Sequence, residues 1–105
     1  MNRFSIGIEL VNAGRLIKKN ENYYSWFKKK IGLNEVLQAI HKNEQNFSYW
    51  HRYTAGQICQ AERVCAILKD RYNIDHILGH DEIAPKRKTD PGPAFPIDIL
   101  RENLL

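Results

Sequence analysis

The segment "TAGQICQAERVCAILKDRY", residues 54–72, decides how the rest of the chain is organised. Its apolar positions recur at helical spacing: Ile58, Ala61, Cys65, Leu68 and Tyr72, with Val64 adjacent. Thr54 stands where an N-cap is expected, and Asn73 is typical of a residue that ends a helix. The sequence therefore predicts one long amphipathic helix over residues 55–72.

Two short apolar runs on either side of this helix predict strands. In "FSIGIELV", Phe4–Val11, the residues Ile6, Ile8 and Leu10 alternate with small or polar ones, which is the period of a strand. The run "IDHIL", Ile74–Leu78, is short and rich in β-branched residues. We expect an α/β fold in which a mixed β-sheet containing both runs packs against the helix.

The remaining segments predict smaller elements. "RLIKK" (15–19) could form a return strand, and "NYYSWF" (22–27) is ambiguous between strand and loop. Asn34 can cap a short helix, "EVLQAIHK" (35–42), and "PIDILRENLL" (96–105) predicts a C-terminal helix. Since no repeat or linker interrupts these elements, the chain reads as a single domain over residues 1–105.

Composition narrows the class of protein. The 105 residues are 43% hydrophobic and 27% charged, as expected for one globular domain. The formal net charge of +4 suits an anionic partner. With no long apolar run and no signal-peptide pattern, we expect a cytoplasmic protein without membrane contact. Cys59 and Cys65 are expected to be reduced thiols on the long helix.

The stretch "ILGHDEIAPKRKTDPGPAF", residues 77–95, combines charged side chains with three of the four prolines. His80 follows a predicted strand, and Asp90 precedes Pro91, which restricts the backbone of Asp90 to extended conformations. One imidazole and one carboxylate on a restrained backbone suit a zinc site with nitrogen and oxygen ligands. A histidine and an aspartate at this spacing are also common in ordinary surface loops.

Two further residues are candidates for catalysis. Glu9 lies within an apolar run, so it either faces solvent or lines a cleft where it could act as a general base. Lys88 stands two residues before Asp90, on the same side of an extended segment, where it could stabilise an oxyanion. The alternative for Lys88 is an ordinary solvated cation.

Other features favour structural or surface roles. His76 would lie too far from His80 along a strand to share a metal, and His41 and His51 are assigned to the surface. The basic and aromatic stretch "KKNENYYSWFKKK" (18–30) could stack on and neutralise a nucleic acid strand. A solvated loop with a few packed rings is favoured, so nucleic acid is an unlikely partner.

Three motifs occur in an order typical of one family: "SIGIELVN" (5–12), "YTAGQ" (53–57) and "GHDEIAPKRKTDPGPAF" (79–95). They resemble the zinc-dependent N-acetylmuramoyl-L-alanine amidases of the type 2 family, which are related in fold to the peptidoglycan recognition proteins. The resemblance extends over essentially the whole chain. It implies a peptidoglycan amidase that hydrolyses the amide between N-acetylmuramic acid and L-alanine in peptidoglycan or muropeptide fragments.

The resemblance also implies roles for individual residues. His80 and Asp90 correspond to Zn2+ ligands, Glu9 to the catalytic glutamate and Lys88 to the lysine that stabilises the oxyanion, while substrate-binding residues are not identified. In the family the remaining zinc ligand is a histidine on a strand well before the "SIGIEL" motif. We therefore expect an N-terminally shortened domain that lacks this strand and has an incomplete zinc ligand set. A strand left exposed in this way would favour self-association.

The shortened domain leaves an alternative function open. The chain could be a catalytically weak or inactive remnant, or a muropeptide-binding module that keeps the fold without turnover.

Overall fold

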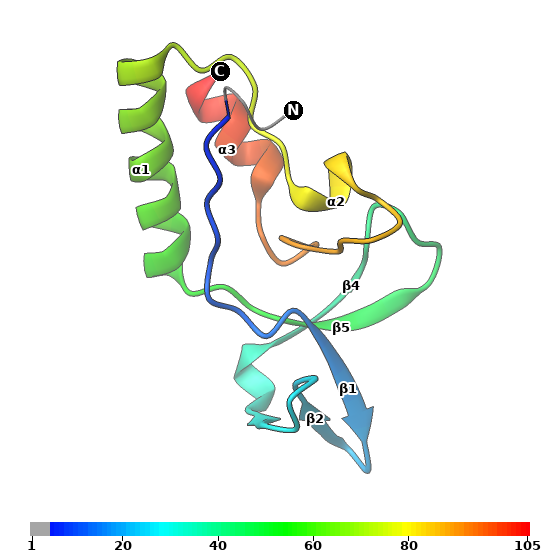
Figure 1. The fold of residues 1–105 in the computed structure, drawn as a ribbon. Helices are drawn as coiled ribbons and strands as arrows, with labels where there is room; N and C mark the ends of the chain where they lie inside the picture. Colours follow the sequence, from blue (N-terminus) through cyan, green and yellow to red (C-terminus); the bar gives the residue numbers. More distant parts are fainter. Residues whose placement is uncertain (1–4) are drawn as a thin grey trace.

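The computed structural model describes residues 5–105, in which a sheet is followed along the chain by helices (Figure 1). The strands are β1 (Arg15–Lys19), β2 (Asn22–Tyr24), β3 (Lys30–Ile31), β4 (Val36–Ile40) and β5 (Phe47–His51). The helices are α1 (Ala55–Tyr72), α2 (His80–Ile83) and α3 (Ile97–Leu104), and a 3-10 turn, η2 (Leu33–Glu35), precedes β4. The α/β class expected from the sequence is confirmed.

The sheet has the strand order β3-β2-β1-β5-β4, and neighbouring strands are antiparallel. Its buried side is formed by Ala13, Leu16 and Ile31. Tyr49, opposite Leu16 in the β1–β5 register, packs against this cluster. The sheet is therefore antiparallel, rather than mixed as expected: short connections join the sequential pairs β1–β2, β2–β3 and β4–β5, and β5 returns antiparallel beside β1.

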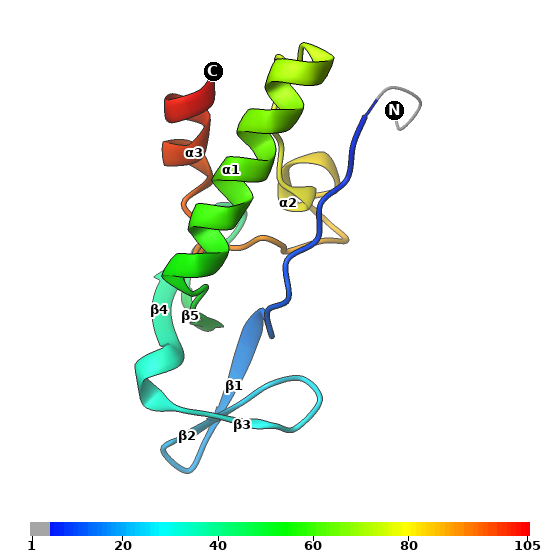
Figure 2. The ribbon, with the colours of Figure 1, turned by 90° about the vertical axis from the view of Figure 1, so that its left-hand side faces the viewer.

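A second apolar cluster lies between the helices. Ala61 of α1 packs with Phe95, Ile97 and Leu100, so that α3 and the segment before it cover one side of α1. The molecule measures 48 × 29 × 23 Å along its principal axes. Figure 2 shows the helices gathered at one end and strands β1 to β3 at the other.

The long helix was predicted correctly, together with its two ends. The Thr54 hydroxyl accepts the N–H of Gln57, and the Gln57 side chain accepts the N–H of Thr54, which forms a capping box. At the other end Asn73 adopts a left-handed conformation with φ of 54°. Cys59 and Cys65 are free thiols on this helix, and the predicted strand 15–19 and C-terminal helix are also confirmed.

The two strands expected beside the helix are not formed. Phe4 lies outside the described residues, and the rest of Phe4–Val11 is extended without a strand ladder. Gln57 of α1 donates its side-chain N–H to the carbonyl of Val11. In Ile74–Leu78, which is also irregular, the carbonyl of Ile77 accepts Nε–H of Arg101, a residue of α3, at 2.8 Å. Side chains from distant helices thus replace strand partners.

The helix predicted over residues 35–42 was also wrong, because most of it forms β4. A short apolar run fits either period, and pairing with β5 decides the outcome. In this pair of strands Trp50 is buried, with 1% of its surface exposed. The ambiguous stretch 22–27 divides into β2 and a loop. None of the helices within residues 5–105 has the length and apolar character needed to cross a membrane.

Candidate functional site

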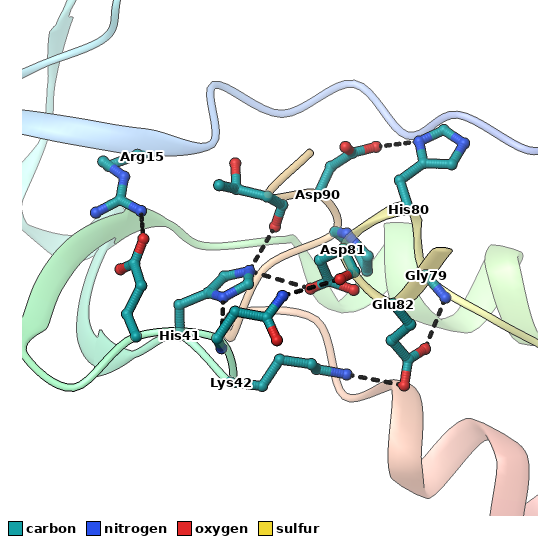
Figure 3. Close-up of polar contacts among 12 residues, drawn as sticks. Arg15, His41, Lys42, Gly79, His80, Asp81, Glu82 and Asp90 are labelled. Carbon is teal, nitrogen blue, oxygen red and sulfur yellow. Dashed lines mark hydrogen bonds and ion pairs between the residues drawn. The ribbon is translucent and has the colours of Figure 1, made fainter. Parts of the chain in front are cut away.

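His80 and Asp90, the two predicted metal ligands, meet in the structure. His80 is the first residue of α2, and its Nδ1 lies 2.6 Å from Oδ2 of Asp90 (Figure 3). Both side chains are open to solvent, with exposed fractions of 41% and 55%. An imidazole nitrogen and a carboxylate oxygen therefore lie side by side at the solvent-exposed surface.

The backbone around this pair is tightly packed. The N–H of Asp81 donates to the carbonyl of Asp90 at 2.8 Å, which joins the two ends of the loop. Gly79, the N-cap of α2, is buried, and a Cβ at this position would lie 2.6 Å from Oδ1 of Asp81 and 2.7 Å from Cδ of Pro91. Because no side chain fits there, glycine allows the two ends of the loop to approach each other.

Glu82 anchors the start of α2 to the rest of the molecule. Its carboxylate accepts the N–H of Gly79 at 2.8 Å, lies 3.1 Å from Nζ of Lys42, and pairs with Arg101 of α3. Burial acts to raise the pKa of Glu82, but the hydrogen bonds from these three groups outweigh burial and lower it. The carboxylate is therefore held in its charged form, which keeps α2 attached to α3.

Tyr53 holds the other end of the loop. Its hydroxyl donates to the carbonyl of Pro91 at 2.9 Å, and its ring packs edge-on against Phe95. Burial, with smaller contributions from the charges of Asp90 and Asp81, raises the pKa of Tyr53 to about 12. The hydroxyl therefore remains a donor well above neutral pH.

The prediction that His41 lies on the surface is wrong. Instead of lying on the surface it is 1% exposed, and its ring stacks on Trp50. Its Nε2 lies 3.0 Å from the carbonyl oxygen of Thr89 and 3.1 Å from Oδ2 of Asp81 (Figure 3). His51 is half-buried, and its Nδ1 accepts the N–H of Ala13.

The hydrogen bonds of His41 define its tautomer. Nδ1 accepts the backbone N–H of Asn43 at 3.1 Å, so the ring proton lies on Nε2 and is donated toward Thr89 and Asp81. Asp81 is also 1% exposed, and its second oxygen, Oδ1, has no hydrogen-bond partner within residues 5–105. The polar segment "KNEQN" between β4 and β5 is typical of a hairpin turn. Recognising this hairpin in the sequence would have placed His41 at the end of a strand.

The structure leaves Glu9 and Lys88 without a defined partner. Both side chains are exposed, and neither makes a side-chain hydrogen bond or ion pair within the described part of the chain. Leu10, which follows Glu9, packs in the helical cluster that also includes Ile77, three residues before His80. Glu9 therefore belongs to a segment that neighbours the one leading into α2.

The donors present fit zinc by type, but they are fewer than a catalytic zinc site normally has. Zinc in such sites normally has three protein ligands and one open position. Across residues 5–105 no group of three or more His, Cys, Asp or Glu side chains is placed to hold a metal. His80 and Asp90 are thus a two-donor pair, open on the solvent side.

Comparison with known proteins assigns the chain to a family. Residues 1–93 match the sequence profile of the family described as N-acetylmuramoyl-L-alanine amidase (type 2), and the chain belongs to this family.

One curated relative is the 1,6-anhydro-N-acetylmuramyl-L-alanine amidase AmpD of Enterobacter cloacae, which is 51% identical over 45 residues. The match covers 41% of this chain and 24% of that protein. No solved structure matches the chain.

Proposed function

We propose that the protein is a zinc-dependent amidase that hydrolyses the bond between N-acetylmuramic acid and L-alanine in peptidoglycan fragments. The observation that carries this proposal is the contact between His80 and Asp90, which lie ten residues apart and meet at an exposed point. Family membership supports the choice of substrate, and the relative's printed name supports a muropeptide in particular.

In this proposal His80 and Asp90 hold the zinc ion through their ring nitrogen and carboxylate. Bound zinc supplies Lewis acidity, which polarises the amide carbonyl and makes a water molecule more acidic. The exposure of both side chains would leave an ion held by them accessible to water and to the amide substrate.

Glu9 and Lys88 are proposed to act directly on the reacting amide. The Glu9 carboxylate takes a proton from the attacking water, whose oxygen bonds to the carbonyl carbon. The same proton then passes to the amide nitrogen as the C–N bond breaks, giving a carboxylic acid and a free amine. The Lys88 ammonium stabilises negative charge on the carbonyl oxygen during attack.

Hydrolysis of an N-acetylmuramoyl-L-alanyl peptide, followed by mass spectrometry with and without added zinc, tests the proposal. His80→Ala and Asp90→Ala are expected to remove zinc binding and turnover. Glu9→Gln should keep zinc binding and lower kcat about 10²-fold to 10⁴-fold, the usual contribution of a general base. Lys88→Ala should lower kcat about 10²-fold to 10³-fold.

The histidine, glutamate and lysine variants each have a matched control elsewhere on the surface. His76→Ala, Glu102→Gln and Lys86→Ala change exposed residues of the same types, whose side chains make no hydrogen bond or ion pair in the described part of the chain. These controls should bind zinc and turn over substrate like the unmodified protein. Equal loss in a control and in its test variant would contradict the assigned roles.

The incomplete donor pair supports a second candidate function, a muropeptide-binding module without turnover. In that case the muropeptide binds with micromolar or weaker affinity but is recovered intact after long incubation with zinc. Calorimetric titration with the same peptide, run beside the hydrolysis assay, separates the two functions.

A further inference from the structure

His41 makes hydrogen bonds to the neighbours of both proposed zinc ligands. Asp81, whose carboxylate it contacts, directly follows His80 in the chain, and Thr89, whose carbonyl it contacts, directly precedes Asp90. One buried imidazole thus connects the two backbone segments that must come together for the ligand pair to form (Figure 3).

The turn that carries His41 adds a further contact to the same segment. The side-chain N–H of Asn43 donates to the carbonyl of Asp81 at 2.9 Å, and the backbone N–H of Asn43 fixes the His41 ring. The ring also stacks on Trp50, and Trp50 in turn lies close to the loop residue Gly92. The imidazole therefore has no freedom to rotate away from the loop.

Burial of this polar pair needs a reason other than stability. Replacing a buried ion pair or hydrogen-bonded pair by apolar side chains of similar size is often neutral or stabilising. Here the pair is retained with one carboxylate oxygen of Asp81 unsatisfied by the described residues, which adds to its cost. Packing alone does not favour the buried pair of His41 and Asp81. A need for directional hydrogen bonds at the loop explains why the pair is there.

We infer that His41 is a positioning residue, which holds His80 and Asp90 at the spacing needed to bind a metal ion together. The inference rests on the proposed function, because it concerns the same ligand pair. His41 touches neither ligand side chain; it acts through the backbone of Thr89 and the side chain of Asp81.

The test compares His41→Leu with His41→Gln. Leucine fills the space but has no donor, whereas the glutamine amide can place an N–H near the position of Nε2. Loss of a residue that orients metal ligands typically weakens metal affinity about 10-fold to 100-fold. We expect this loss in zinc affinity for His41→Leu, and affinity within about 3-fold of the unmodified protein for His41→Gln.

Amide hydrogen exchange provides a readout that needs neither zinc nor turnover. The N–H of Asp81 donates to Asp90 and reports directly on closure of the loop. In His41→Leu this amide should exchange at least ten times faster, while amides in α1 such as that of Ala61 keep their rates. An unchanged Asp81 rate together with unchanged zinc affinity would overturn the inference, as would an equal acceleration in α1.

A milder variant covers the case in which His41→Leu does not fold, since leucine leaves Asp81 unpaired. Asn43→Ala removes one hydrogen bond from an exposed residue and should weaken zinc binding about 2-fold to 10-fold, with faster exchange at Asp81. Gln45→Ala, in the same turn and without a contact in the described chain, is the control and should change neither. Equal behaviour of the two variants would also overturn the inference.

Failure of the proposed function gives a different pattern. If the unmodified protein neither binds zinc nor cleaves the peptide, the proposed function is wrong. The exchange rate at Asp81 in the His41 and Asn43 variants still decides whether His41 closes the loop.

Discussion

Tyr53 illustrates how one side chain links stability to the site. It stands directly before the N-cap of α1, and its hydroxyl donates to the carbonyl of Pro91, at the end of the loop that carries His80 and Asp90. The hydroxyl must stay protonated to donate this bond. Burial among apolar neighbours and the nearby carboxylates of Asp90 and Asp81 favour the protonated form.

A loss of stability at high pH follows from this raised pKa. The pKa of Tyr53 is raised to about 12 in the folded chain, against about 10 for an unperturbed tyrosine. Its contribution to the free energy of unfolding is therefore fully present below about pH 10 and is lost as the pH rises to about 12. Urea denaturation at intervals across this range measures the loss.

Tyr53→Phe is the matched variant for this measurement. It should be less stable at neutral pH by about 0.5–1.5 kcal/mol, because one hydrogen bond is removed. Above pH 10 it should lose less stability than the unmodified protein. Identical pH profiles for the two proteins would show that Tyr53 does not titrate in this way.

At the scale of elements, α1 is the part of the fold most fully determined by nearby residues. Its period, its cap and its left-handed end all lie within residues 54–73, so the sequence could predict them. The segment 36–40 lacks this local definition, because five residues fit a strand and a helical turn equally well. Its conformation depends on pairing with β5, which a local pattern does not contain.

The capping box of α1 gives a prediction at this scale. Thr54→Ala removes the hydroxyl that accepts the N–H of Gln57 and should lower the free energy of unfolding by about 1 kcal/mol. Thr54→Ser keeps the hydroxyl and should change stability by less than about 0.5 kcal/mol. Thermal unfolding of the two variants side by side measures the difference, and equal melting temperatures would contradict the role of the cap.

The candidate site likewise combines contacts within a short stretch of sequence with contacts between residues far apart in the chain. His80 and Asp90 could be predicted because a short motif carries both, with Pro91 restraining the second. His41 could not, because its contact with Thr89 joins residues 48 positions apart. Likewise, Arg101 reaches Ile77 across 24 positions and replaces the strand pairing that the apolar run predicted.

For the whole molecule, the segment 5–11 presents exposed apolar side chains near the helices. Ile6, Ile8 and Val11 are 48%, 42% and 90% exposed, and Ile6 lines a shallow hollow with Tyr72 and Ile74. Exposed apolar groups on an extended backbone favour contact with another chain. The expectation of self-association drawn from the sequence therefore stays a prediction, now attached to residues 5–11.

Sedimentation velocity at increasing protein concentration tests this prediction. The unmodified protein should show a concentration-dependent rise in average mass, and Ile6→Lys with Ile8→Lys should reduce it by charge repulsion and loss of apolar surface. Ile99→Lys, at an exposed apolar position on α3, is the control and should associate like the unmodified protein. A monomer at all concentrations would show that this surface does not mediate self-association.

The order of elements along the chain has a consequence for the stage of synthesis at which His80 and Asp90 can meet. All five strands of the described chain lie within residues 15–51, so the sheet, including the pairing of β1 with β5, can assemble before the helices have left the ribosome. Closing the loop requires residues as far apart as His41 and Thr89 to meet, and contacts between such distant residues form late in folding. A chain cut short before Asp90 would then possess its sheet but not the contact between His80 and Asp90, so this contact forms only after most of the chain has been synthesised.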